Sequence, residues 1–100
     1  MARTKVIALK CEPLFEVTNI VATPALMQKV EPEYAMACLA QHMTGDWGLV
    51  DDEDKATNDW AVKNDARILS VYPLPDDPDV FWIITEADRS VTTFLLPSEY

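Results

Sequence analysis

"RILSVYPLPDDPDVFWIITEADRSVTTFLLPSEY" occupies residues 67–100, and three apolar runs within it decide the fold. The runs at 67–74, 80–87 and 90–97 are rich in β-branched and aromatic residues. Prolines and aspartates separate the first two runs, and charged residues separate the last two. The pattern predicts three strands joined as an antiparallel meander. Alternation along the last hairpin selects four core candidates, which are Trp82, Ile84, Phe94 and Leu96.

The N-terminal part of the chain predicts two more short strands. Residues 4–10 and 14–22 have the composition of strands, and Pro13 stands between them. Three helices should follow. One covers 24–30 and begins at a Thr-Pro pair, the next runs from Pro32 to about Met43, and a third follows the run of acids that opens at Asp51.

Helical spacing also predicts which side chains are buried. Met36, Leu39 and Met43 recur at intervals of three and four, which favours them as the buried stripe of the second helix. Trp60 and Ala56 should form the apolar seam of the third helix. The two glycines of the chain lie within "TGDWG" at 44–48, which predicts a helix stop and a tight turn.

Helices and strands are segregated along the chain, which is typical of an α+β fold. We expect an antiparallel sheet of about four to five strands with two to three helices packed on one face. One hundred residues suffice for one core and not for two, so residues 1–100 should form a single small globular domain.

The net charge of −9 is unevenly distributed. Residues 1–43 hold equal numbers of acids and bases, whereas 44–65 hold seven acids and two bases and 66–100 hold six acids and two bases. Carboxylates repel phosphate, so direct binding to nucleic acid is disfavoured and a protein partner with a basic surface is favoured. The short apolar run near the start predicts neither a signal peptide nor a membrane span, which favours a cytoplasmic protein.

The chain lacks the patterns of common catalytic and cofactor sites. Cys38 and His42 have the spacing of two metal ligands on one helix, but a closed zinc site needs about four ligands and the chain has one histidine and two cysteines. No nucleophile elbow or phosphate-binding glycine loop occurs. We therefore expect no catalytic residues, no metal and no cofactor. Cys11 and Cys38 should be reduced thiols in the cytoplasm, although two cysteines could in principle pair.

The acidic helix is the first candidate site. At about 100° per residue, most of its aspartates fall within an arc of roughly 160°. Such a face could simply keep a small protein soluble, or it could imitate the phosphates of DNA and bind the basic groove of a nucleic-acid-binding protein. The candidate partner-binding residues are Asp51, Asp52, Glu53, Asp54, Asp59 and Asp65.

A pocket between the "GDWG" turn and the "ITEADRS" hairpin is the second candidate. It would serve a small enzyme or a ligand-binding domain and would use Asp46, Trp47, Glu86, Asp88 and Arg89. The alternative is a charged turn that joins two buried strands. A buried salt bridge from Arg89 to an acid of "GDWG" is a third possibility.

Five stretches carry a resemblance to a known family. They are "LFEVTNIVATPAL" (14–26), "HMTGDWG" (42–48), "DEDKATND" (52–59), "RILSVY" (67–72) and "WIITEADRSVTTFLLPSEY" (82–100). The chain resembles short bacterial proteins carried by plasmids and phages, often labelled plasmid-related or type I restriction subunit M-like. A methyltransferase would need a much larger cofactor-binding domain with a glycine-rich loop, so that activity is not expected.

The resemblance implies a mobile genetic element as the context and brings no established activity with it. Together with the acidic surface, it predicts a non-enzymatic interaction protein that binds, and inhibits, a nucleic-acid-processing or defence complex. Anti-restriction and anti-CRISPR proteins act in this manner. A homo-oligomer assembled through an exposed strand edge is a further possibility.

Overall fold

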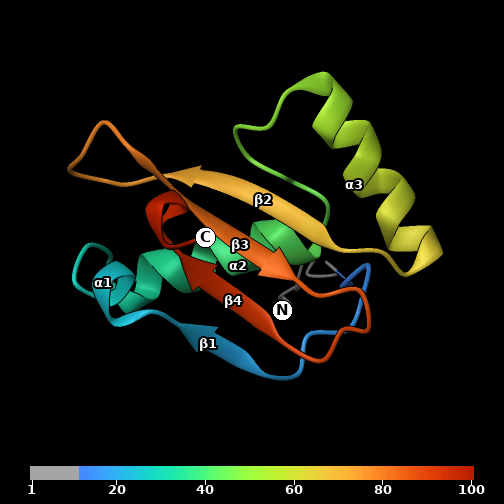
Figure 1. Cartoon of the computed structure of the whole chain (residues 1–100), viewed down its shortest axis with the longest axis horizontal. Helices are drawn as coiled ribbons and strands as arrows, with labels where there is room; N and C mark the ends of the chain where they lie inside the picture. The colour runs from blue at the N-terminus through green and yellow to red at the C-terminus, as the bar shows by residue number, and fades with distance from the viewer. Residues whose placement is uncertain (1–11) are drawn as a thin grey trace, which may run out of the picture.

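The computed structural model describes residues 12–100, which form a four-stranded sheet with helices packed against it (Figure 1). The α+β class is therefore confirmed. The elements are β1 (Ile20–Ala22), α1 (Pro24–Met27), α2 (Pro32–Met43), α3 (Asp52–Asn64), β2 (Ile68–Pro73), β3 (Val80–Thr85), β4 (Thr92–Leu95) and the 3-10 helix η1 (Pro97–Glu99). The strand expected over residues 4–10 lies outside the described residues.

The sheet has the strand order β1-β4-β3-β2. The β2–β3 and β3–β4 pairs are antiparallel, so the meander expected from residues 67–97 is confirmed. β1 differs from an all-antiparallel sheet, because it pairs with β4 in parallel. The parallel pairing follows from the path of the chain, which leaves β1, passes through all three helices and returns along the far edge of the sheet before reaching β4.

The strand expected over 14–22 is confined to its last three residues. The preceding residues run toward the end of α2 instead, where the Leu14 amide donates to the Met43 carbonyl over 2.8 Å. Phe15 is buried there among residues of the α3 side of the core. Burial of this ring holds the segment away from β4, so the strand starts only at Ile20.

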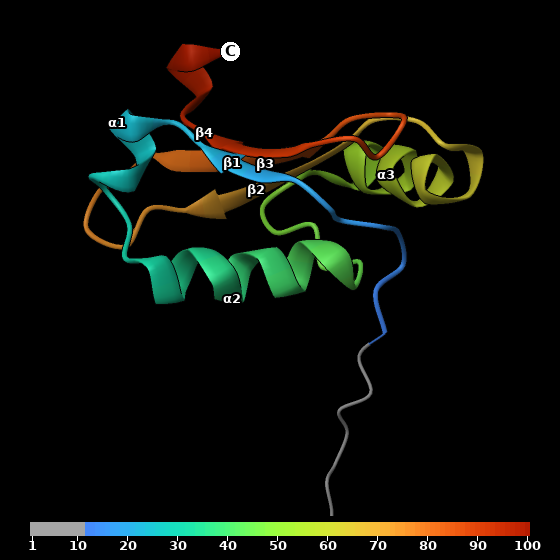
Figure 2. The same ribbon diagram turned by 90° about the horizontal axis from the view of Figure 1, so that it is seen from below.

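Thr23 and Pro24 begin α1 as the sequence predicts, since the Thr23 hydroxyl accepts a hydrogen bond from the Leu26 amide at 3.2 Å. α2 covers one face of the sheet (Figure 2), and of the expected stripe of Met36, Leu39 and Met43 only Leu39 is fully buried. Met36 is 52% exposed and Met43 half-buried. The buried residues of α2 are Ala35, Cys38, Leu39 and His42. Small side chains in this set let α2 approach the aromatic rings of the sheet closely.

The strand residues that face α2 include Phe81 and Ile83, and both are fully buried. Of the four core candidates, Phe94 lies on this face and is buried, and Leu96 is half-buried just beyond β4. Trp82 and Ile84 lie on the opposite face of β3, where Ile84 is buried but Trp82 is only half-buried. The second face also carries apolar side chains, and it is covered in part. The C-terminal segment folds over the second face, and the ring of Tyr100 packs edge-on against Trp82 with centroids 5.5 Å apart. Figure 2 shows η1 and the C-terminus on the side opposite α2.

α3 lies alongside the edge strand β2, at the level of the sheet (Figures 1 and 2). The predicted seam of Trp60 and Ala56 is wrong, because Trp60 is 58% exposed and Ala56 is also exposed. The helix buries Asn58 and Ala61 instead. Asn58 is buried because the edge of β2 presents backbone N–H and C=O groups that need hydrogen-bond partners. An asparagine side chain can both donate to and accept from them, whereas a tryptophan side chain can only donate.

Candidate functional site

The acidic helix α3 begins where a run of four acids meets a helix N-terminus. Asp51 is the N-cap, and its carboxylate accepts a hydrogen bond from the Asp54 amide at 2.8 Å. Asp52, Glu53 and Asp54 occupy the first turn, where the positive end of the helix dipole stabilises negative charge. The local sequence therefore both starts the helix and concentrates carboxylates at one of its ends.

Two side-chain contacts fasten α3 to the rest of the fold. The Asn58 side chain donates to the Leu69 carbonyl at 2.8 Å and accepts from the Leu69 amide at 3.1 Å, as a neighbouring strand would. The indole of Trp47 donates to the carboxylate of Asp59 at 3.0 Å. Trp47 is only 2% exposed, so this bond ties a core residue to the helix.

Arg89 fastens the other end of α3. Its guanidinium donates to the carbonyls of Ala61 at 3.0 Å and Ala66 at 2.7 Å, and it lies 5.5 Å from the ring centroid of Phe15. A cation at a helix C-terminus interacts favourably with the helix dipole. A salt bridge from Arg89 to an acid of the "GDWG" turn was a possibility, but the described partners of its guanidinium are backbone carbonyls.

These contacts divide the six acids of the first candidate site. Asp51 and Asp59 hold structural hydrogen bonds, and Asp65 ends the helix in a left-handed conformation with φ of 52°. The side chains of Asp52, Glu53 and Asp54 are exposed and form no hydrogen bond or ion pair with the described residues. The acidic cluster, defined as Asp52, Glu53 and Asp54, is therefore available to a partner, and so is the exposed side chain of Asp65 at the other end of α3.

The residues of the second candidate site do not come together in one pocket. Trp47 and Arg89 both pack against Phe15, with the centroid of the Trp47 ring 6.3 Å from that of Phe15. Asp46 accepts from the Gly48 amide at 3.3 Å and from Gln41 at 3.1 Å.

The acids of the "ITEADRS" hairpin are engaged separately. Glu86 lies 3.4 Å from Arg67, and Asp88 accepts from the Ser90 amide at 3.0 Å. The hydrogen bond to Ser90 holds the pKa of the Asp88 carboxyl below its ordinary value. Each of these acids thus caps a turn or pairs with a neighbour, and the four hollows described on the surface are lined by other residues.

A buried polar chain was not foreseen as a unit. His42 Nδ1 lies 2.6 Å from the Ser70 hydroxyl, and His42 Nε2 lies 2.9 Å from Thr85 Oγ1, which lies 2.8 Å from Thr92 Oγ1. Burial lowers the pKa of His42 to about 3, so the ring is neutral at pH 7. All four side chains are at most 1% exposed, so no substrate can reach them. The sequence signal that could have predicted this chain is the presence of polar residues at inward-facing positions of otherwise apolar strands.

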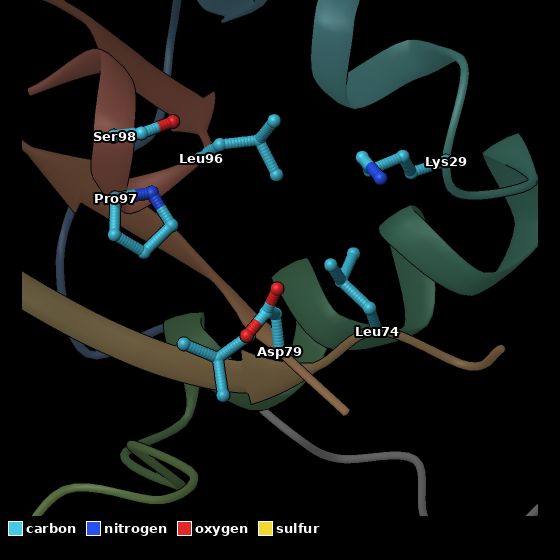
Figure 3. Close-up of a pocket in the computed structure, with 7 residues that line it drawn as sticks. Lys29, Leu74, Asp79, Leu96, Pro97 and Ser98 are labelled. Atoms are coloured by element: carbon cyan, nitrogen blue, oxygen red, sulfur yellow. The ribbon is translucent and has the colours of Figure 1, made fainter. Parts of the chain in front are cut away.

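The hollow shown in Figure 3 has a volume of about 350 Å³ and lies near η1. Leu74, which follows β2, and Leu96, which precedes η1, point into it. Lys29 and Asp79 line the same space, and the Lys29 amine lies 3.4 Å from the carboxylate of Asp77. An apolar floor with one amine and one carboxylate could hold a small amphipathic molecule, but it presents no pair of groups arranged for acid-base chemistry.

Within residues 12–100, no group of three or more potential ligands could hold a metal ion. Cys38 is a buried free thiol whose pKa is raised by burial, and Cys11 lies outside the described residues. No helix of the described part has both the length and the apolar character needed to cross a membrane.

Comparison with protein-family models, with curated proteins and with solved structures found no match. The resemblance to plasmid- and phage-borne proteins thus remains a prediction.

Proposed function

We propose that this chain is a non-enzymatic interaction protein of a mobile genetic element, and that its acidic cluster binds a basic surface on a nucleic-acid-processing or defence complex. Binding would inhibit the complex, in the manner of anti-restriction and anti-CRISPR proteins. The single observation that carries the proposal is the contrast within α3: the other acids of its first two turns hold structural bonds, whereas Asp52, Glu53 and Asp54 are free among the described residues.

The position of α3 supports this assignment. The helix is fastened through its middle by Asn58 and at its end by Arg89, so its first turn is held without using the acidic cluster. A rigid support lowers the entropy lost on binding. The cluster and Asp65 stand at opposite ends of a helix about 20 Å long, at a rise of about 1.5 Å per residue.

Carboxylates held along such a length can replace DNA phosphates in a basic groove. The partner is therefore expected to be a protein that itself binds nucleic acid. Association should be fast at low salt and should weaken as salt screens the charges over a Debye length of about 8–10 Å.

The test is affinity capture of partners from host lysate at low salt, with the full chain and with the variant Asp52→Asn/Glu53→Gln/Asp54→Asn. The wild-type chain should retain a basic nucleic-acid-binding protein, and added duplex DNA should compete for it. The triple variant should bind at least about tenfold more weakly, which is about 1.4 kcal/mol.

The matched control neutralises three exposed acids elsewhere, as Glu16→Gln/Glu31→Gln/Glu33→Gln. It changes the net charge equally and includes Glu33 in the first turn of α2, so it also matches part of the helix-dipole effect. Equal capture by wild type and the Asp52 triple variant would contradict the assignment to α3. Recovery of no basic partner at low salt would contradict the proposed function itself.

A further inference from the structure

The outer edge of β1 is open among the described residues. β1 has β4 as its neighbour on one side and no described strand on the other. The Asn19 carbonyl accepts from the Thr92 amide at 2.8 Å, and the Thr23 amide donates to the Phe94 carbonyl at 3.1 Å. Because backbone groups alternate in direction along a strand, the N–H and C=O groups of Ile20 and Ala22 point away from β4.

Apolar side chains surround this edge. Ile20 and Val21 are 45% and 47% exposed, and Met27 and Met36 are 45% and 52% exposed. They line a hollow of about 180 Å³ that β1 shares with α1 and α2. A strand with free backbone groups beside exposed apolar side chains is a template for pairing with another strand.

The distribution of charge indicates which strand pairs with this edge. Residues 17–30 hold no aspartate or glutamate, although the chain has a net charge of −9. Two copies of an acidic protein repel one another over most of their surfaces, and the repulsion is least where carboxylates are missing. The Glu99 carboxylate does lie at one end of this edge, where it accepts a hydrogen bond from the Thr23 hydroxyl at 2.7 Å, so carboxylates are sparse at the edge and not absent from it. The edge of β1 is therefore a part of the surface at which two copies can approach with little repulsion.

We propose that β1 pairs antiparallel with β1 of a second copy, across a two-fold axis at Val21. In this register Ile20 stands opposite Ala22 of the partner subunit, and such a pair exchanges both of its backbone hydrogen bonds. All the outward groups of Ile20 and Ala22 are then satisfied in both copies. Ile20 faces the small side chain of Ala22 of the partner subunit, and Val21 faces its own copy on the axis. Pro24, which lacks an N–H, ends the pairing.

The dimer has a single sheet that runs through both subunits, with the two β2 strands at its outer edges. Each α3 lies beside its own β2, so the two acidic clusters stand at opposite ends of the assembly. The proposal goes beyond the proposed function and uses none of the same side chains. A variant that abolishes the dimer should therefore still bind the proposed partner, and a variant of the acidic cluster should still form the dimer.

The first measurement is the mass of the full-length protein by light scattering and sedimentation from about 1 µM to about 500 µM. The wild type should pass from monomer to dimer in this range. Ile20→Lys places a charge on the edge, and the dimer dissociation constant should rise at least about tenfold. Leu49→Lys is the matched control, since Leu49 is 60% exposed and lies outside β1, and it should dimerise as wild type does.

The second measurement is amide hydrogen exchange at Ile20 and Ala22. In the wild type their exchange should slow at least about tenfold as the protein concentration rises through the dimer range. Unchanged protection at Phe81 and Ile83 in Ile20→Lys shows that the variant is folded.

A wild-type monomer at every concentration would overturn the proposal, as would an Ile20→Lys dimer of unchanged affinity. Protection at Ile20 and Ala22 that does not depend on concentration would also overturn it, because the edge would then be covered within one chain.

Discussion

β2 and β1 are the two outer strands of the same sheet, yet their edges differ. Outward groups of β2 bond to the backbone at 47–49, to the side chain of Asn58 and to the hydroxyl of Tyr34. Pro73 removes one further donor. β1 has no comparable cover among residues 12–100. The contrast shows that the chain closes one edge with a turn and a helix, which makes the acidic side of the molecule a poor place for strand addition.

Gly48 lies in the turn that covers the edge of β2, and its substitution should have the largest effect on stability. A Cβ at this position would lie 1.9 Å from the Val71 carbonyl oxygen, and the residue has φ of +78°. We expect Gly48→Ala to push the turn away from β2 and to lower the free energy of unfolding by at least about 3 kcal/mol, measured by urea denaturation.

Gly45→Ala is the matched control for this prediction. Its φ is +94°, but its Cβ would approach only the flexible end of Leu14, at 3.0 Å. The expected loss is about 1–2 kcal/mol, the ordinary cost of a left-handed alanine. Equal losses at the two glycines would mean that contact with the edge of β2 is unimportant.

The second prediction concerns His42, which is buried between α2 and the sheet. The pKa of His42 is lowered by burial from 6.5 to about 3, so the unfolded chain binds a proton at a higher pH than the folded chain. Stability from this residue is fully present above pH 6.5 and is lost as pH falls toward 3. At pH 4.5 the loss should be about 2.7 kcal/mol, at about 1.36 kcal/mol per pH unit.

His42 is the only histidine of the chain, so its ring can be followed by NMR without assignment. The ring signals should stay those of the neutral form down to about pH 4. A titration midpoint near 6.5 in the folded protein would contradict the burial of His42 and the polar chain with Ser70 and Thr85.

The third prediction has the smallest expected effect and concerns Asn58 in α3. Asn58→Ala leaves the Leu69 amide and carbonyl without partners, which should cost about 2 kcal/mol of stability and speed hydrogen exchange at Leu69. Asn64→Ala removes an exposed bond to the Trp60 carbonyl in the same helix and should cost about 0.5 kcal/mol or less. If the two variants are equally stable, Asn58 does not cover the edge of β2.

The sequence predicted the parts of the fold that depend on neighbours along the chain. Alternating apolar residues produced the meander, the Thr-Pro pair and Pro32 started two helices, and the glycines of "TGDWG" placed the turn. The acids at the start of α3 were equally visible, because capping and helix-dipole effects act over one turn. What the sequence left open was which faces and edges these elements cover.

Only the tertiary structure decided those pairings, because each joins residues far apart in the chain. Burial of Asn58 in place of Trp60 depends on the backbone of β2. The hydrogen bonds of Arg89 depend on where α3 ends. The hydrogen bonds of His42 depend on two strands whose residues lie far from it in the sequence. Polar groups must find partners when buried, and the identity of the partner is a property of the packed fold, which local pattern does not contain.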